Sequence, residues 1–179
     1  MKASTQPQSS SVVADHYSRR TVLAFQYGSL AFAVIGLLWG VVFAAIGWWS
    51  VVALDVGIIT TGLAIYLLIR RGRLASGILA AQAALMVIAI IMGLMLDVPT
   101  ADAPRVSHIY LLVLAALGYL NYQRGKSTAQ LVLIGLCLLA FVVLASTPLA
   151  TPLAVTMPDG LRIAGSWANT IVATTMLAA

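Results

Sequence analysis

The chain has 179 residues, of which 61% are hydrophobic and only 8% are charged, and its formal net charge is +5. Soluble domains carry about 25% charged residues, so this composition excludes an ordinary water-soluble domain and indicates an integral membrane protein. The composition also excludes a disordered chain, a collagen-like chain and a disulfide-stapled secreted domain. Cys137 is the single cysteine and lies in an apolar run, so we interpret it as a small side chain of the helical core.

The first 20 residues are polar and end in the basic pair Arg19 and Arg20, which predicts a cytosolic N-terminal tail. This tail is similar in charge to the start of a signal peptide. The apolar stretch that follows, residues 22–46, is however longer than the 7–15 apolar residues of a cleavable signal. We therefore expect the first helix to be retained.

Hydrophobic runs long enough to cross a membrane recur along the chain. A helix rises about 1.5 Å per residue, so about 20 residues cross a hydrocarbon core of about 30 Å. The predicted spans are residues 22–46, 49–69, 75–96, 108–123, 129–147 and 163–179. The sequence thus predicts an all-α, integral membrane six-helix bundle over residues 21–179.

The basic residues predict how the bundle is oriented. Only Arg105 and Arg162 lie in connectors on the far side from the N-terminus. By the positive-inside rule, both termini are expected in the cytoplasm, as in a multi-pass protein of the cell's inner (plasma) membrane. Trp48 and Trp49, in the first outer turn, are expected at the membrane interface. The basic residues on the N-terminal side are Lys2, Arg19, Arg20, Arg70, Arg71, Arg73, Arg124 and Lys126.

The last predicted span, residues 163–179, is at the lower length limit for a membrane crossing. It contains no Lys or Arg, whereas a final helix often closes with a basic cytosolic anchor. We therefore expect that the sixth helix is truncated at Ala179 and continues in a longer protein.

Ionisable side chains inside the predicted spans are the candidate functional residues. Asp55 falls in the outer half of the second span and is expected to be paired or protonated, because a lone charge in hydrocarbon is costly. His108 lies at the outer entry of the fourth span, where an Asp55–His108 pair is geometrically possible, and Tyr110 follows it. Two interpretations stay open: an outer-leaflet ligand-binding or proton-sensing site, and a polar clamp between helices.

Other features of the spans predict helix packing rather than chemistry. Gly36 and Gly40 have the spacing that allows two helices to approach closely, and Gln82, Asn121 and Asn169 can hydrogen-bond to neighbouring helices. The sequence shows no soluble catalytic signature and no metal-ligand spacing, and it predicts no cofactor. Its basic residues mark helix ends rather than a nucleic-acid surface.

The chain resembles the six-helix N-terminal membrane anchor of bacterial class III adenylate cyclases, in particular the mycobacterial enzyme. The resemblance spans nearly all of the chain in helix count, loop lengths and topology. The stretches that carry it are Ala14-Asp15-His16-Tyr17-Ser18-Arg19-Arg20, Gln130-Leu131-Val132-Leu133-Ile134-Gly135-Leu136, Pro158-Asp159-Gly160-Leu161, and the group of Trp167, Asn169, Thr170 and Ile171.

This resemblance implies a membrane anchor that forms a homodimer, receives a hydrophobic or lipid-like signal and controls a cytosolic output domain. No catalytic residue of a cyclase is present in the chain. Similar six-helix sensors precede histidine kinases and diguanylate cyclases, so these outputs remain alternatives. Two further alternatives are a small structural subunit of a larger membrane complex and a half-transporter that functions as a dimer.

Overall fold

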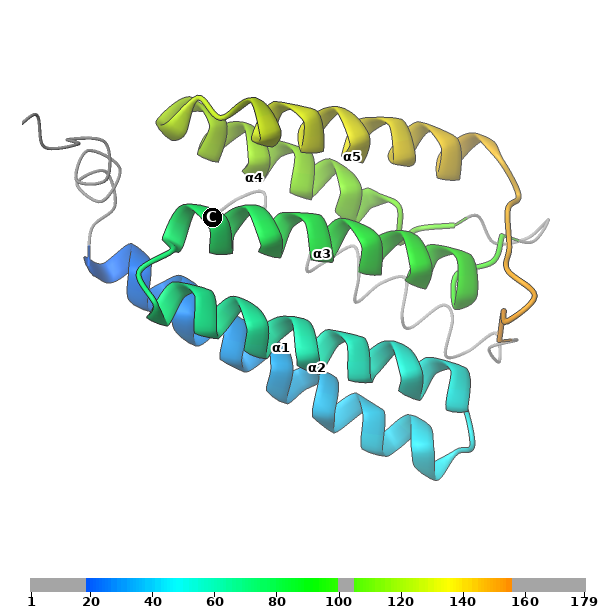
Figure 1. Cartoon of the computed structure of the whole chain (residues 1–179). Coiled ribbons are helices and arrows are strands. Elements are labelled where there is room, and N and C mark those ends of the chain that lie inside the picture. Colours follow the sequence, from blue (N-terminus) through cyan, green and yellow to red (C-terminus); the bar gives the residue numbers. More distant parts are fainter. Residues whose placement is uncertain (1–18, 100–104, 156–179) are drawn as a thin grey trace, which may run out of the picture.

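The computed structural model describes residues 19–99 and 105–155, and these residues form five helices without a strand among them (Figure 1). The all-helical prediction is therefore confirmed for this part of the chain. The helices are α1 (Arg19–Ala45), α2 (Trp49–Arg70), α3 (Leu74–Met95), α4 (Ile109–Gly125) and α5 (Thr128–Ser146).

Four of the described helices, α1, α2, α3 and α5, are long and apolar enough to cross a membrane. Helix α4 has 17 residues, which at about 1.5 Å per residue is shorter than a typical hydrocarbon core of about 30 Å. The sixth predicted span, residues 163–179, lies outside the described residues. The number of crossings and the side on which the termini lie therefore stay predictions.

Two glycines make the tight turns that reverse the chain between the first three helices. Gly47 follows α1 with φ of +80°, and Gly72 follows α2 with φ of +76°. This left-handed conformation is strained for residues with a Cβ, and glycine adopts it freely at helix ends. Because of these turns, α2 runs antiparallel to both α1 and α3, as Figure 1 shows.

Helix α3 lies between two helix pairs. Helix α1 packs along α2, α4 packs along α5, and α3 contacts helices of both pairs. In Figure 1 the turn between α2 and α3 and the turn between α4 and α5 lie at the same end of the bundle. The basic residues Arg70, Arg71, Arg73 and Lys126 therefore share one end, and the connector between α3 and α4 lies at the other.

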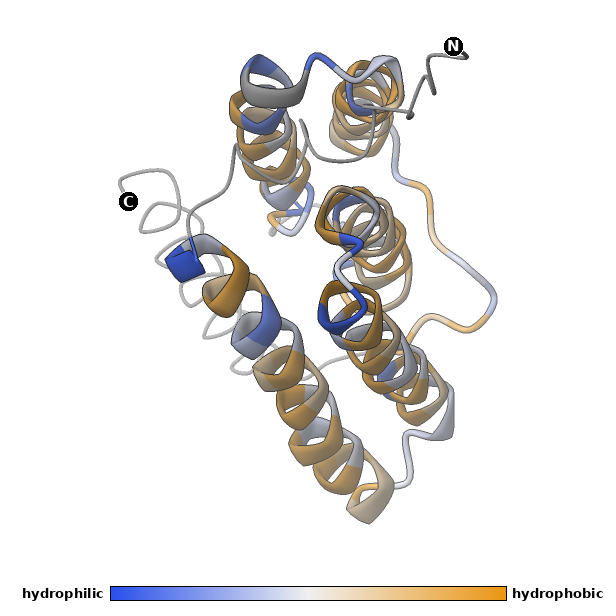
Figure 2. Cartoon of the chain, turned by 60° about the vertical axis from the view of Figure 1, so that its left-hand side comes forward, coloured by the Kyte–Doolittle hydropathy of each residue, from blue (hydrophilic) through white to orange (hydrophobic). Residues whose placement is uncertain are grey.

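The outer surface of the bundle is apolar. Figure 2 shows hydrophobic residues over most of each helix, and Leu38 and Val41 of α1 are 62% and 63% exposed. On α5, Leu139 is 61% exposed. Continuous apolar patches of this kind are rare on soluble monomers, whereas a helix surrounded by lipid presents apolar side chains in all directions. These helices suit a membrane.

Small residues bring α1 and α2 close together. A Cβ atom added to Gly36 would lie 2.7 Å from Cγ2 of Ile58, and one added to Gly62 would lie 2.8 Å from the backbone oxygen of Ser29. A Cβ on Gly40 would lie 3.3 Å from Cβ of Asp55. Gly36 and Gly40, which were expected to serve helix packing, thus lie where α1 meets α2, and Gly62 provides the closest approach from α2.

Candidate functional site at one end of the bundle

Arg105 is buried near the start of α4, with 4% of its surface exposed. Its Nε donates a hydrogen bond to the backbone oxygen of Asp97 at 3.0 Å, and its Nη1 donates to the backbone oxygens of Leu144 at 2.8 Å and Thr147 at 3.4 Å. Its Nη2 donates to the backbone oxygen of Leu149. The guanidinium therefore links the segment between α3 and α4 to the end of α5.

The sequence of α5 explains why its end needs such a donor. In an α-helix, the carbonyl of Leu144 would accept a hydrogen bond from the N–H of residue 148. That residue is Pro148, which has no N–H. Arg105 supplies the missing donor, and its positive charge lies at the helix end where carbonyl dipoles favour a cation.

The carboxylate of Asp97 binds backbone N–H groups at the start of α4, as Arg105 binds backbone carbonyls at the end of α5. Its Oδ2 accepts hydrogen bonds from the backbone N–H groups of Val106 and Ser107, both at 2.6 Å. These N–H groups precede the first turn of α4, where a negative charge is stabilising. We call the side chains of Asp97 and Arg105, with the backbone groups that they bind, the latch.

Burial shapes the titration of the charged and polar groups around the latch. Burial lowers the pKa of the Arg105 guanidinium, while the nearby Asp97 carboxylate acts in the opposite direction. Burial also lowers the pKa of the His108 imidazole; Asp97 raises it and Arg105 lowers it further. The net lowering of this pKa from the ordinary value of about 6.5 favours the neutral form of the imidazole.

Two polar atoms beside the latch have no hydrogen-bond partner in the described part of the chain. They are Oγ of Ser107 and Nδ1 of His108, both buried. The His108 ring lies 5.1 Å from the ring of Phe141, centroid to centroid. A Cβ atom added to Gly93 of α3 would lie 3.1 Å from Oγ of Ser107, so α3 packs closely against this region.

Asp55 lies in a different part of the bundle. It is 4% exposed and faces Gly40 of α1, whose added Cβ would lie 3.8 Å from Oδ2 of Asp55. This Oδ2 atom is buried and has no hydrogen-bond partner among the residues that the structure describes. The carboxyl group therefore lies between α1 and α2, enclosed by apolar helices.

The structure does not bring Asp55 and His108 together as a hydrogen-bonded pair. Each carries a buried polar atom without a partner, and His108 contacts Phe141 of α5 whereas Asp55 faces α1. Tyr110 packs on the buried cluster of Ala89, Leu111 and Leu144, and Phe141 packs on the same cluster. The three predicted sensing residues are thus divided between the α1–α2 contact and the α3–α4–α5 contact.

A pair of buried glutamines joins α3, α4 and α5. Gln82 donates from Nε2 to the backbone oxygen of Leu114 at 3.3 Å and accepts a hydrogen bond from Nε2 of Gln130. Gln82 was predicted to bond to a neighbouring helix, whereas its partner Gln130 was not. Asn121 is half-buried near the end of α4, and Asn169 lies outside the described residues.

The two tryptophans of the first outer turn differ in exposure. Trp49 is 68% exposed, whereas Trp48 is half-buried and stacks on Phe43, with ring centroids 5.8 Å apart. Trp49 is therefore the residue of the two that is free to lie at the membrane interface.

Among the residues that the structure describes, no group of three His, Cys, Asp or Glu side chains could hold a metal ion. The latch was not predicted from the sequence, because Arg105 was interpreted only as a charge on the far side from the N-terminus. The sequence features that indicate it are Arg105, one of few basic residues on the side opposite the N-terminus, and Pro148 just after a predicted helix.

No family model matches the chain, and neither the curated proteins nor the solved structures include a match.

Proposed function

We propose that the chain is the membrane anchor and receptor module of a signalling protein, with a class III adenylate cyclase as its output and both termini in the cytoplasm. It works as a homodimer and responds to a hydrophobic or lipid-like ligand in the outer leaflet. The resemblance described above supports the cyclase output, and the apolar outer surface of the described helices supports a lipid environment.

The observation that carries the receptor role is the buried Oδ2 of Asp55, which has no hydrogen-bond partner within residues 19–99 and 105–155. A polar group inside hydrocarbon is costly, and ionisable residues there most often serve function. A purely structural clamp would give this carboxyl group a partner on another helix. The free oxygen between α1 and α2 favours an atom that receives a proton or a donor group of a ligand.

Such an event would act through helix packing. A ligand shifts an equilibrium only when it binds one arrangement better than the other. Asp55 faces Gly40, where α1 and α2 are in close contact, so a new bond to the carboxyl group favours a packing in which α1 and α2 are further apart. Because α3 contacts α2 as well as α4 and α5, this change can be transmitted to the rest of the bundle.

A fusion protein tests the receptor role. The chain is joined at its C-terminus to a class III cyclase catalytic domain that is active only as a dimer, and cyclic AMP is measured in membranes across pH values and lipid compositions. We expect output above that of the soluble catalytic domain, and we expect Asp55→Asn to change its dependence on pH or lipid. Thr60→Val is the matched control, because Thr60 is an exposed residue of the same helix.

Two results would contradict the proposal. Output equal to that of the soluble domain would show that the chain does not dimerise its partner domain. An Asp55→Asn fusion that matches the parent under every condition would remove Asp55 from the mechanism and would favour a structural subunit. The proposed orientation is tested separately, by a cytoplasm-specific reporter inserted after Lys126 and after Gly47, of which only the first is expected to be active.

A further inference from the structure

Three arginines lie close together in the turn that joins α2 to α3. Arg70 is the last residue of α2, and Arg71 and Arg73 flank Gly72, whose φ of +76° helps to reverse the chain. All three arginine side chains are exposed. We call Arg70, Arg71 and Arg73 the arginine turn.

The backbone of the arginine turn is held by its own contacts. The N–H of Arg73 donates a hydrogen bond to the backbone oxygen of Leu68 at 3.0 Å. A Cβ atom added to Gly77 of α3 would lie 2.7 Å from Cγ1 of Ile69, so α2 and α3 are in contact next to the turn. The three guanidinium groups are therefore presented on the surface from a fixed backbone.

No acidic side chain of the described residues offsets this positive charge. The described ranges contain two aspartates and no glutamate. Asp55 is buried between α1 and α2, and Asp97 lies between α3 and α4, at the opposite end of the bundle (Figure 1). Within residues 19–99 and 105–155 the arginine turn thus forms no ion pair, and its guanidinium groups are available to an anion from outside the chain.

The length of α2 places the arginine turn at the level of lipid headgroups. Trp49, at the other end of α2, is 68% exposed and suits a membrane interface. From Trp49 to Arg70, α2 extends about 32 Å at about 1.5 Å per residue, which matches a hydrocarbon core of about 30 Å. Tyr66, one helical turn before Arg70, is a residue type enriched at such interfaces. The arginine turn therefore lies among the headgroups of the leaflet opposite Trp49.

We propose that the arginine turn binds the phosphate of an anionic phospholipid in preference to a zwitterionic lipid. A guanidinium group donates two parallel hydrogen bonds to a phosphate, and basic sites beside membrane helices bind anionic headgroups. Each arginine near an anionic surface strengthens binding about fivefold, which corresponds to about 1 kcal/mol. This inference does not depend on the proposed receptor role, because it concerns the end of α2 far from Asp55.

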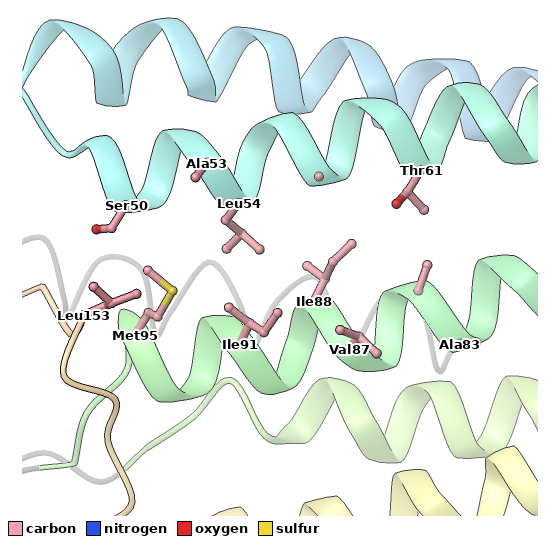
Figure 3. A pocket seen from close by; sticks show the side chains of 12 residues that line it. Ser50, Ala53, Leu54, Thr61, Ala83, Val87, Ile88, Ile91, Met95 and Leu153 are labelled. Carbon is pink, nitrogen blue, oxygen red and sulfur yellow. The ribbon is translucent and has the colours of Figure 1, made fainter.

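The headgroup, rather than the acyl chains, is the part of the lipid that this site holds. Helices α2 and α3 do enclose an apolar groove of about 550 Å³, lined from Ser50 to Thr61 on α2 and from Ala83 to Met95 on α3 (Figure 3). Thr61 is about 14 Å from Arg70 along the helix. One leaflet is about 15 Å deep, so an acyl chain that starts at the arginine turn ends where the groove begins.

Binding of phosphatidylglycerol to the purified full chain tests the proposal. The chain is titrated in uncharged micelles with phosphatidylglycerol, or with phosphatidylcholine of the same acyl chains, and bound lipid is counted by native mass spectrometry. We expect the parent to bind phosphatidylglycerol more tightly. Arg70→Gln, Arg71→Gln and Arg73→Gln should each weaken this binding about fivefold and leave phosphatidylcholine binding unchanged.

Lys126→Gln is the matched control. Lys126 is an exposed cation in the turn between α4 and α5, at the same end of the bundle (Figure 1), and its loss should change phosphatidylglycerol binding little. The arginine side chains have no bonding partner in the described part of the chain, so the arginine variants should unfold in uncharged micelles much as the parent does. A loss of lipid affinity then reports on the site and not on the fold.

Two results would overturn the proposal. Equal affinity of the parent for the two lipids would show that the arginine turn does not recognise the anionic headgroup. A loss with Lys126→Gln as large as that with the arginine variants would show that the whole basic end attracts anions without a site. Either result leaves the cyclic AMP measurement unaffected, so the two proposals can fail independently.

Discussion

Arg105 and Leu144 are 39 positions apart in the chain, and Nη1 of Arg105 donates a hydrogen bond to the backbone oxygen of Leu144 at 2.8 Å. This bond replaces the one that Pro148 cannot make. The same guanidinium binds the backbone oxygen of Asp97. One side chain thus holds the connector between α3 and α4 against the last turn of α5.

Replacing Arg105 should therefore destabilise the bundle strongly. Arg105→Gln removes the donor of the buried carbonyl of Leu144 and the donors of three partly buried carbonyls. An unsatisfied buried group costs about 1–3 kcal/mol, so we expect the free energy of unfolding to fall by about 3 kcal/mol. The measurement is unfolding of the purified chain in mixed micelles. Arg71→Gln, at an exposed position in the turn after α2, should have little effect, and an equal loss in both variants would contradict the role of the latch.

The helices and turns of this fold could be predicted from the sequence with good accuracy. The predicted second span, residues 49–69, agrees with α2 (Trp49–Arg70), because the hydrophobic run sets its length and arginines mark its C-terminal end. The fourth hydrophobic run, residues 108–123, was predicted to cross the membrane, and the structure shows a helix of 17 residues there. Its hydrophobic run ends early because Asn121 and Gln123 precede the basic turn.

Side-chain partners could not be predicted in the same way. Helical periodicity shows which residues share a face, but it does not show which helices are neighbours. The Asp55–His108 pair required α2 beside α4, whereas α3 lies between the pair α1–α2 and the pair α4–α5. Arg105 bonds to backbone oxygens of distant residues, and of these acceptors only the Leu144 carbonyl is marked in the residue types, by Pro148 four positions later.

His108 should make stability depend on pH. Burial lowers the pKa of its imidazole, so between this value and about 6.5 the unfolded chain binds more protons than the folded chain. Stability therefore rises with pH in that range. The contribution of His108 to stability is fully present above about pH 6.5 and is lost as the pH falls toward the pKa that His108 has in the folded chain.

Melting temperatures measured from pH 5 to 8 check this expectation. His108→Phe retains a ring against Phe141 and cannot titrate, so its melting temperature should fall less on acidification than that of the parent. His16→Gln, in the N-terminal tail, is the matched control and should retain the full pH dependence. An unchanged profile for His108→Phe would show that another group titrates.

Gly93 should tolerate no side chain while Ser107 is present. A Cβ atom there would lie 3.1 Å from Oγ of Ser107, so we expect Gly93→Ala to cost about 1–2 kcal/mol despite the better helix propensity of alanine. Ser107→Ala removes the opposing Oγ atom, which has no hydrogen-bond partner to lose. The double variant should recover most of the loss in a double-mutant cycle of unfolding free energies.

The control for this cycle is Gly135→Ala on α5. A Cβ atom at Gly135 meets nothing within 4 Å, so this change should be neutral or stabilising by up to about 1 kcal/mol. If Gly93→Ala behaves like Gly135→Ala, α3 does not pack against Ser107 as described.

The contact between α1 and α2 should depend on Gly62. Gly62→Ala directs a Cβ atom at the backbone oxygen of Ser29, 2.8 Å away, and a backbone atom cannot move aside as a flexible side chain can. The helices must separate, and we expect a loss of about 1–3 kcal/mol. Gly28→Ala, where a Cβ atom meets nothing within 4 Å, is the matched control in the same unfolding assay, and equal losses would contradict the close packing.

The glutamine pair should show coupling between α3 and α5. Gln82→Leu removes the acceptor of Gln130 and the donor to the carbonyl of Leu114, whereas Gln130→Leu leaves that second bond in place. In membrane helices such side-chain bonds couple by about 0.6 kcal/mol, with a maximum of about 1.7, so the double variant should lose less stability than the two single losses added together. Gln123→Leu, at an exposed position on α4, should be additive with either change. Strict additivity of the Gln82 and Gln130 variants would show that no bond joins the two side chains, and α5 would then depend on its apolar contacts and the latch alone.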